Sequence, residues 1–407
     1  MNASQPDVER VARLREALPA TNAGIYLDTG TAGPLPLETI AAMRQVEDYA
    51  VRFGRAAPEA RDELLGRLDE ARAVAAAVVA ADPSAVALTH GTLDGLAVAA
   101  WAPDWRTGDE ALVTSLDGPA PSIALGPVLE RFGVELRVVD VGDGQDATAV
   151  LSRIEAAITP RTRLVAAPHV SPLTGAVLPA AGIARLARAH GAWSAVDGSQ
   201  AVGAIPVDAR DVGADVYAFP SEAWLLGPEG VGAAVLSDRA VGEARRARAG
   251  EADGDLVAGE RGARTASRFD APGMHLPSVV GFARGAGWLA MHVGLAWIHE
   301  RGAGSARALA DRLRAAPGVT VATPVGAAAT LVTFRVAGWT SDDAADALRR
   351  RAFAVIRALP GDGGIRASVA FFNTDAELAQ FAEAVELVAR HTPATMPHRP
   401  ELVVLPE

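Results

Sequence analysis

The stretch Tyr217–Gly230 reads YAFPSEAWLLGPEG, a short apolar strand that runs into a turn rich in Gly and Pro. A β-turn formed by the GPEG end accounts for these Gly and Pro residues, but it leaves the rest of the string unexplained. The string is too specific for a generic surface loop. We therefore take it as the first candidate for a functional site and work outward from it.

Upstream of this stretch, apolar runs of strand length alternate with helical segments. Strands separated by helices of this length predict a mainly parallel sheet that is covered on both faces. The seven expected strands are 85–89, 111–116, 134–141, 162–170, 193–198, 215–220 and 231–237. A helix is expected at 59–81, before the first strand, and others near 93–102, 123–132, 149–157 and 180–190.

Downstream, the pattern changes. A charged, Gly-rich segment, Gly250–Arg268, is typical of an exposed connection, and a long helical segment, Leu276–Arg301, follows it. The remaining chain reads strand, strand, helix, strand, helix, which predicts a smaller α+β domain with an antiparallel sheet. We expect an N-terminal segment at 1–25 that packs with this small domain, a large domain at 26–260, and the connecting helix with the small domain at 261–407.

The composition excludes several classes of function. The chain has 407 residues, 50% of them hydrophobic, and a net charge of -11, which argues against nucleic acid or an anionic membrane as a partner. It has no Cys, so thiolate chemistry is excluded, and the spacing of its eight His residues predicts no metal site. No segment resembles a signal peptide or a membrane span, so we expect a cytoplasmic protein. All 38 basic residues are Arg, and Lys is absent.

Two further places carry chemistry. At Thr89-His90-Gly91-Thr92 a strand ends and a helix begins, and the free N–H groups of such a turn suit a phosphate, although a plain turn and helix cap explains it too. Asp197 lies at the carboxyl end of an apolar strand. It either points into the ligand crevice of the sheet or caps the next helix.

The order of these motifs resembles the class V aminotransferase family of pyridoxal-phosphate enzymes, and within it the isopenicillin-N-epimerase-like and cysteine-desulfurase-like proteins. The resemblance runs collinearly from about Tyr26 to Arg390. It rests on YLDTGTAGPLP, THGT, HVSPLTGAVLP, VDGSQAVG, YAFPSEAWLLGPEG and IRAS. It implies the α/β fold of fold-type-I enzymes, the cofactor pyridoxal 5'-phosphate (PLP) and a homodimer.

The resemblance also implies roles for individual residues. Asp197 matches the catalytic aspartate that keeps the pyridine nitrogen of the cofactor protonated. An arginine at the start of a strand suits a substrate carboxylate, because its planar fork binds both oxygens. The implied cofactor-binding residues are Gly91, Thr92, His169, Asp197, Gln200 and Ser221, and the implied substrate-binding residues are Arg366 and Gly30. A satisfied core histidine is an equal alternative for His169.

The sequence departs from the family at its central position. The lysine that forms a Schiff base with the cofactor is replaced by Ala223, and no other lysine exists to stand in. PLP would therefore bind noncovalently or as an external aldimine. In addition, the segment Asp117–Pro127 offers no histidine or aromatic residue to stack on the cofactor ring.

Two histories fit this departure: a lysine replaced deliberately by Ala223, or a natural relative that lost covalent catalysis. The retained Asp197, Gln200, Thr92 and Arg366 favour the first. We expect an enzyme acting at the α- or β-carbon of an amino acid, with β-elimination at the C–S bond of a cysteine conjugate in secondary metabolism as the favoured reaction. The alternative is a non-catalytic or cofactor-independent binding or scaffold protein on the same fold.

Overall fold

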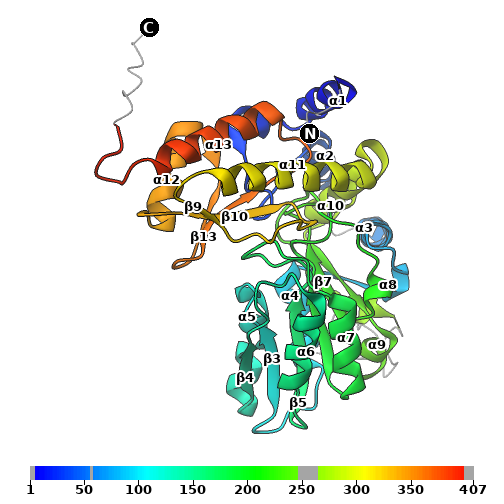
Figure 1. Cartoon of the computed structure of the whole chain (residues 1–407). Coiled ribbons are helices and arrows are strands. Elements are labelled where there is room, and N and C mark those ends of the chain that lie inside the picture. Colours follow the sequence, from blue (N-terminus) through cyan, green and yellow to red (C-terminus); the bar gives the residue numbers. More distant parts are fainter. Residues whose placement is uncertain (1–4, 56–57, 246–264, 398–407) are drawn as a thin grey trace.

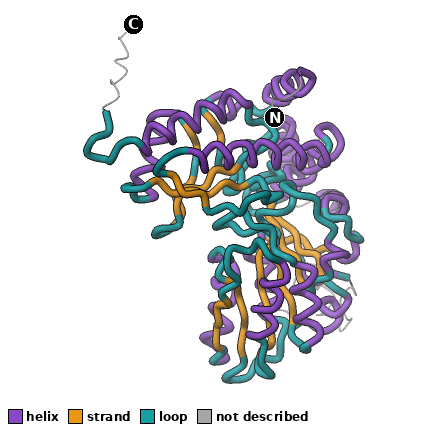
Figure 2. The backbone as a smooth tube through the Cα atoms, in the orientation of Figure 1, coloured by secondary structure: helices purple, strands orange, loops and turns teal. Residues whose placement is uncertain are grey.

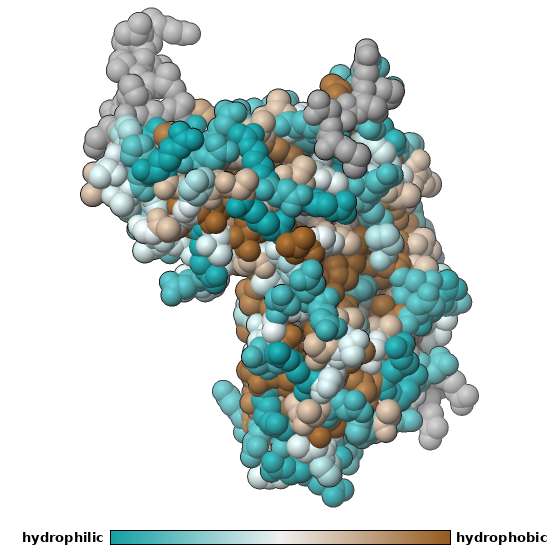
Figure 3. Space-filling view, in the orientation of Figure 1, coloured by the Kyte–Doolittle hydropathy of each residue, from teal (hydrophilic) through white to brown (hydrophobic). Residues whose placement is uncertain are grey.

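The computed structural model of the protein describes residues 5–55, 58–245 and 265–397. Within these ranges the chain forms two lobes, one built around a seven-stranded sheet and the other around a four-stranded sheet. Helices lie on the outside of both lobes, and the strands lie inside (Figure 1; Figure 2). The space-filling view shows the molecule hollowed on one side between the lobes, with hydrophobic residues gathered where the lobes meet (Figure 3).

The strands of the large sheet lie in the order β2-β8-β7-β6-β5-β3-β4. Neighbours run parallel except at β8, which is antiparallel to both β2 and β7. The prediction of a mainly parallel seven-stranded sheet is confirmed. The central strands are buried along their whole length, which explains their continuous apolar runs. The bounds are β2 (Val86–Thr89), β3 (Glu110–Thr114), β4 (Glu135–Val139), β5 (Thr162–Pro168), β6 (Trp193–Asp197), β7 (Val216–Pro220) and β8 (Gly232–Leu236).

Helices cover both faces of this sheet. Successive side chains of a strand point to opposite faces, and in β6 the neighbours Ala195 and Val196 belong to two different hydrophobic cores. One face packs against α4, and α7 contacts β5 and β6. The helices of this lobe are α2 (Leu37–Phe53), α3 (Pro58–Val78), α4 (Thr92–Trp101), α5 (Pro119–Phe132), α6 (Ala147–Ala157), α7 (Ala180–Ala189), α8 (Ala209–Val212), α9 (Asp238–Glu243) and α10 (Leu276–Trp288), with short 3-10 turns η2 (Pro83–Ala85) and η4 (Ala266–Phe269).

The small lobe has an antiparallel sheet in the order β12-β13-β10-β9, as the sequence predicts. The N-terminal strand β1 pairs in parallel with β11, so the start of the chain joins this lobe. The strands are β1 (Ile25–Tyr26), β9 (Val319–Val321), β10 (Leu331–Val336), β11 (Ala354–Val355), β12 (Arg357–Leu359) and β13 (Gly364–Ser368), and the helices are α1 (Gln5–Glu16), η1 (Pro19–Asn22), α11 (Leu295–Ala315), α12 (Ser341–Ala352) and α13 (Asp375–Ala389).

The single long helix expected at Leu276–Arg301 is wrong. The segment consists of α10, a π-helical turn η5 (Leu289–Val293) and the start of α11, and it bends by 84° at Gly294. Gly294 adopts φ 85° and ψ 110°, a backbone conformation that ends a right-handed helix. In the described part of the chain no single helix is long and apolar enough to cross a membrane, and only these two bent pieces taken together reach that length and composition.

Two predictions are not tested by the structure. The expected connection Gly250–Arg268 falls mostly on residues 246–264, outside the described residues. The domain boundaries at 25 and 260 also stay predictions.

Candidate active site

Asp197 ends β6 at the carboxyl edge of the large sheet and is buried. One carboxylate oxygen, Oδ1, accepts a hydrogen bond of 2.8 Å from the backbone N–H of Ser199. Burial raises the pKa of this carboxyl above its usual range. The next residue must be glycine, because a Cβ on Gly198 would lie 2.4 Å from the ring of Tyr217. Asp197 is therefore a fixed acidic group to which a cationic N–H donor would be a favourable partner.

An uncapped helix start lies at the end of β2. Gly91 is the N-cap of α4, with φ 138° and no side-chain cap, and a Cβ there would meet open space. The first N–H groups of α4 therefore lack a capping side chain and face a site where the helix dipole favours an anion. The hydroxyl of Thr92 is buried beside them and has no hydrogen-bond partner among the described residues.

A second unpartnered hydroxyl comes from the end of β7. Ser221 is fully buried, and its Oγ has no partner within the ranges that the structure covers. The two strand ends are close together, because a Cβ on Gly232 would lie 2.8 Å from the Cα of Gly91 and 3.2 Å from the Cα of Pro220. The backbones at Gly91 and Pro220 therefore both approach Gly232, although they are far apart in sequence, and a shared phosphate contact of Thr92 and Ser221 stays a prediction.

Ala223 follows in the same turn and is 3% exposed. The turn is held from the N-terminal segment, where the N–H of Gly33 donates to the carbonyl oxygen of Glu222 at 2.7 Å. A Cβ on Gly33 would lie 2.6 Å from the carbonyl oxygen of Ala223, so this close approach requires glycine. The side chain at 223 is a methyl group, and the site has no lysine.

The sequence analysis missed Glu222, which lies between Ser221 and Ala223. Its Oε2 is buried without a partner among the described residues. Burial, and secondarily the charge of Glu229, raise the pKa of this carboxyl, while the backbone N–H groups of Glu222 and Ser221 lower it. A charged residue inside an otherwise apolar motif is the signal that could have revealed it.

Gln200 connects the turn to the N-terminal segment. Its Nε2 donates to the carbonyl oxygen of Gly30 at 2.8 Å, and its Oε1 accepts from Nε1 of Trp224 at 3.1 Å. Gly30 has no room for a side chain, because a Cβ would lie 2.6 Å from Oε1 of Gln200. These predicted site residues are thus brought together, and their roles toward cofactor and substrate stay predictions.

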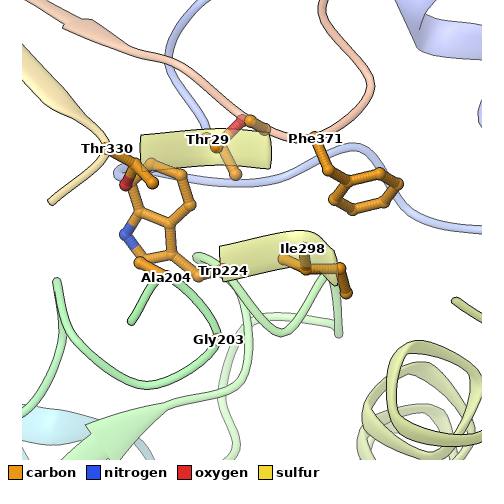
Figure 4. A pocket seen from close by; sticks show the side chains of 9 residues that line it. Thr29, Gly203, Ala204, Trp224, Ile298, Thr330 and Phe371 are labelled. Carbon is orange, nitrogen blue, oxygen red and sulfur yellow. The ribbon is translucent and has the colours of Figure 1, made fainter. Parts of the chain in front are cut away.

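Beyond Gln200, the indole of Trp224 lines a small cavity between the lobes. Figure 4 shows the indole and Thr330 on one side of this cavity and Phe371 on the other, with Thr29 between them. Both threonine hydroxyls are buried without a partner among the described residues. Trp224 therefore packs at the joint of the two lobes.

Arg366 lies in β13 and is buried. It donates to Oγ1 of Thr31 at 2.8 Å and forms an ion pair of 3.5 Å with Asp28, while its Nε has no partner among the described residues. Burial lowers the pKa of the guanidinium, and Asp28 opposes this effect. The sequence analysis missed Asp28, whose position in YLDTG gives no sign of this pairing. Arg366 therefore keeps one unpaired donor, and its role toward a substrate carboxylate stays a prediction.

His169 directly follows β5 and contacts Asp197 at the edge of the large sheet. The N–H of His169 donates to the carbonyl oxygen of Asp197 at 2.9 Å, and its Nδ1 lies 2.8 Å from the hydroxyl of Tyr217. Burial lowers the pKa of His169 to about 4, so the ring is neutral near pH 7. Its side chain also lines a surface groove with Arg185. A cofactor contact of His169 therefore stays a prediction.

The sequence analysis names Asp117 only as the start of a segment without a histidine or aromatic residue. Its Oδ2 accepts hydrogen bonds from the N–H and the hydroxyl of Thr114, while Oδ1 is buried without a partner in the described part of the chain. Burial, and then the nearby charge of Asp197, raise its pKa to about 7. Two buried carboxyls, Asp117 and Asp197, thus share this end of the sheet.

The residues present fit PLP at two of its ends. The unpartnered hydroxyl of Thr92 at the start of α4 and that of Ser221 after β7 suit a phosphate, and the buried Asp197 suits a protonated ring nitrogen. Covalent attachment through a lysine has no counterpart, because the chain contains no lysine. The described residues contain no group of three or more His, Cys, Asp or Glu that could hold a metal ion.

Comparison with known proteins finds a matching family, relatives in sequence and similar solved structures. The sequence model described as "Aminotransferase class-V" matches residues 25–381. A probable cysteine desulfurase of Methanothermobacter thermautotrophicus is 32% identical over 235 residues, which are 58% of this chain and 58% of that protein. The isopenicillin N epimerase of Streptomyces clavuligerus is 28% identical over 393 residues, 89% of this chain and 94% of that protein.

A probable cysteine desulfurase of Mycolicibacterium paratuberculosis is 29% identical over 358 residues, or 82% of this chain. The match spans 51% of that relative and 58% of the one from Methanothermobacter, so the chain covers little more than half the length of these two proteins.

Solved structures confirm the fold. A lysine-to-alanine mutant of C-DES, with glycine covalently linked to its PLP cofactor, superposes with a TM-score of 0.84 at 24% identity, covering 91% of this chain and 98% of that one. The apo cysteine desulfurase of Thermococcus onnurineus superposes with a TM-score of 0.80 at 21% identity, covering 96% and 100%. The predicted fold-type-I architecture is therefore confirmed.

Proposed function

Because this chain belongs to the aminotransferase class-V family, we propose that it binds PLP noncovalently and that its site is built for cleavage of a C–S bond in a cysteine-type amino acid. The observation that carries the proposal is the pair of unpartnered hydroxyls of Thr92, at the uncapped start of α4, and Ser221, directly after β7, together with the buried Asp197 at the end of β6. Curated relatives named as cysteine desulfurases support the substrate class.

Each end of the cofactor has residues to hold it. Thr92 and Ser221 would donate hydrogen bonds to its phosphate, together with the first N–H groups of α4. Asp197 would accept the ring N–H, and the positive charge of that partner would lower the raised pKa of the carboxyl. When bound, PLP supplies an aldehyde that reacts with amines and a ring that withdraws electrons from the α-carbon of the substrate.

The substrate carboxylate would bind at Arg366. Its Nε is a buried donor without a partner in the part of the chain that the structure describes, and the ion pair with Asp28 and the bond to Thr31 hold the guanidinium in place. A planar, fixed fork of donors favours a carboxylate, which accepts two parallel hydrogen bonds.

Elimination fits this chain better than sulfur transfer to the protein. A transfer that leaves the sulfur on a cysteine side chain needs a thiolate, and the 407 residues contain no Cys. Elimination breaks the bond between Cβ and sulfur and releases the sulfur as a free thiol, so it needs no protein thiol. We place this reaction on a cysteine conjugate in secondary metabolism, in a cytoplasmic homodimer.

We further propose that Ala223 stands where the catalytic lysine of an active form stood. The surrounding turn is intact, and Ser221 and Asp197 keep the hydrogen-bonding capacity that a cofactor requires. The methyl group neither bonds to the aldehyde of PLP nor moves the α-proton of a substrate. The chain as it stands would therefore bind cofactor and amino acid without completing turnover.

Restoring the lysine tests the proposal. PLP is added to the wild-type chain, to Ala223→Lys and to the control Arg210→Lys, which places a lysine on an exposed helix. After borohydride reduction, peptide mapping should find the cofactor attached to residue 223 of Ala223→Lys. In the control it should find no cofactor attached to the lysine. C–S lyase activity with S-substituted cysteines should appear with Ala223→Lys alone. If neither wild type nor Ala223→Lys binds PLP, the proposal is wrong and a cofactor-independent binding protein is the better description.

A further inference from the structure

Two arginines lie directly opposite each other in the small sheet. Arg366 of β13 pairs across the antiparallel ladder with Arg357 of the edge strand β12. Side chains of residues paired in this way point to the same face of a sheet, and like charges directly opposite each other destabilise the pairing. Arg366 is buried, whereas Arg357 is exposed. An arrangement of this kind calls for a compensating anion.

The hydroxyl of Thr31 joins the two arginines. Its oxygen, Oγ1, accepts a hydrogen bond of 2.8 Å from Nη2 of Arg366 and one of 3.2 Å from Nη1 of Arg357. The same hydroxyl donates to Oδ1 of Asp28 at 2.7 Å. The two guanidinium groups therefore lie close together, with Asp28 beside them, although these residues come from distant parts of the sequence.

One carboxylate serves two guanidinium groups in this cluster. Asp28 forms an ion pair of 3.5 Å with Arg366, while Arg357 forms no ion pair with any residue that the structure describes. Burial raises the pKa of Asp28, and Thr31 and the two arginines oppose this effect. Burial lowers the pKa of Arg366, and the charge of Arg357 lowers it further. The described part of the chain therefore leaves a positive charge on this face of the sheet without a counter-ion.

We propose that Arg357 is a specificity-determining residue that binds a second, distal carboxylate of the substrate, while Arg366 binds the α-carboxylate. This inference rests on the proposed function and narrows its substrate class to an S-substituted cysteine whose sulfur substituent ends in a carboxylate. The two carboxylates of such a substrate match the two guanidinium groups on one face of the sheet. Elimination would release the substituent as a thiol that carries the distal carboxylate.

The burial of each arginine suits the carboxylate assigned to it. Arg366 is held by Thr31, by Asp28 and by a bond of 3.4 Å from its Nη1 to the carbonyl oxygen of Pro172, so it offers a fixed donor to the α-carboxylate that every amino-acid substrate has. Arg357 is exposed, and among the described residues only its Nη1 has a hydrogen-bond acceptor. The other donors of its fork are free for a substituent that extends toward solvent.

Two ligands that differ only in the distal charge test this inference. S-carboxymethylcysteine carries the second carboxylate, and S-carbamoylmethylcysteine carries an uncharged amide of the same shape in its place. Both are titrated by calorimetry into the PLP-loaded wild-type chain, Arg357→Gln and the control Arg307→Gln, which removes an exposed arginine of α11 in the same lobe. Because no turnover is required, the measurement reports binding alone.

The wild type should bind the carboxylate ligand about tenfold more tightly than the amide, which is the size expected for one charge-assisted hydrogen bond. Arg357→Gln should lose this preference, because its affinity for the carboxylate falls to that for the amide. Arg307→Gln should keep the wild-type preference. The preference should also shrink at high ionic strength, since Arg357 is exposed.

The outcomes separate this inference from the proposed function. If the wild type binds both ligands equally, Arg357 is a solvated arginine of an edge strand and the inference is wrong, while the proposed function stands. If Arg357→Gln keeps the preference, another cation recognises the distal carboxylate, which also overturns the inference. If the wild type takes up no PLP or binds neither ligand, the proposed function fails and this inference fails with it. The comparison of the two ligands on the wild type decides the point even if Arg357→Gln does not fold.

Discussion

At the scale of single residues, the edge of the large sheet carries buried carboxyl groups that are not fully hydrogen-bonded within the described part of the chain. Asp117 is one of them, with a folded-state pKa of about 7 against an ordinary value of 3.8, owing to burial and to the charge of Asp197. Because the folded state holds the proton more tightly than the unfolded chain, Asp117 favours folding fully below pH 4. That contribution is lost as the pH rises to about 7. Between pH 5 and 8 this loss amounts to about 2–3 kcal/mol.

The substitution Asp117→Asn should remove this dependence, since the amide oxygen still accepts the bonds from Thr114. Urea unfolding at pH 5 and pH 8 measures this effect. From pH 5 to pH 8 the free energy of unfolding of the wild type should fall relative to that of Asp117→Asn. Equal changes in both proteins would mean that Asp117 is not buried as described.

At the scale of elements, the break between α10 and α11 aims two helices at two different lobes. Gly294 makes this possible through its positive φ of 85°, while a Cβ there would find only the end of Arg10 at 3.9 Å. Gly294→Ala should therefore cost about 1–2 kcal/mol of unfolding free energy through backbone strain alone. Gly304→Ala, in the middle of α11 and next to open space, is the control and should stabilise by about 0.5–1 kcal/mol. Denaturant unfolding decides this, and a stabilised Gly294→Ala would contradict the assigned bend.

At the scale of the whole molecule, Arg15 helps to fasten the N-terminal helix α1 to the small lobe, beside the contacts of Asp7 and Arg10 with Trp297. Arg15 donates to the carbonyl oxygens of Thr21 and Phe372 and forms an ion pair of 2.9 Å with Glu377 at the start of α13. Arg15→Ala leaves these acceptors unpaired and should cost about 1–3 kcal/mol. Limited proteolysis should then release α1 faster than in the exposed control Arg307→Ala. Equal cleavage rates would show that α1 is held by other contacts.

The sequence predicts the parts of this fold that depend on local pattern. The large sheet is predictable because its strands are buried on both faces. Asp197, Gly91 and Thr92 are predictable because each ends a strand or begins a helix, whereas Ser221 is a candidate only through the family resemblance. The bend at Gly294 is missed because the apolar spacing continues through it. Parallel pairing of the two-residue strands β1 and β11 is also missed, since the partners lie more than three hundred residues apart.

Side-chain orientation is the other limit on prediction from sequence. Nothing in the sequence shows that Asp28 pairs with Arg366 or that the Oε2 of Glu222 is buried without a partner. Both facts depend on where the N-terminal segment crosses the turn at 221–223, and that crossing is set by the packing of Gly30 and Gly33.

A crystal structure of the wild-type chain grown with PLP tests the central claim most directly. The account predicts the ring nitrogen within hydrogen-bonding distance of Asp197, and the phosphate against Thr92, Ser221 and the first N–H groups of α4. No covalent bond to residue 223 should be present. Clear density with protein side chains filling that space, or with the ring bound in another place, would contradict it.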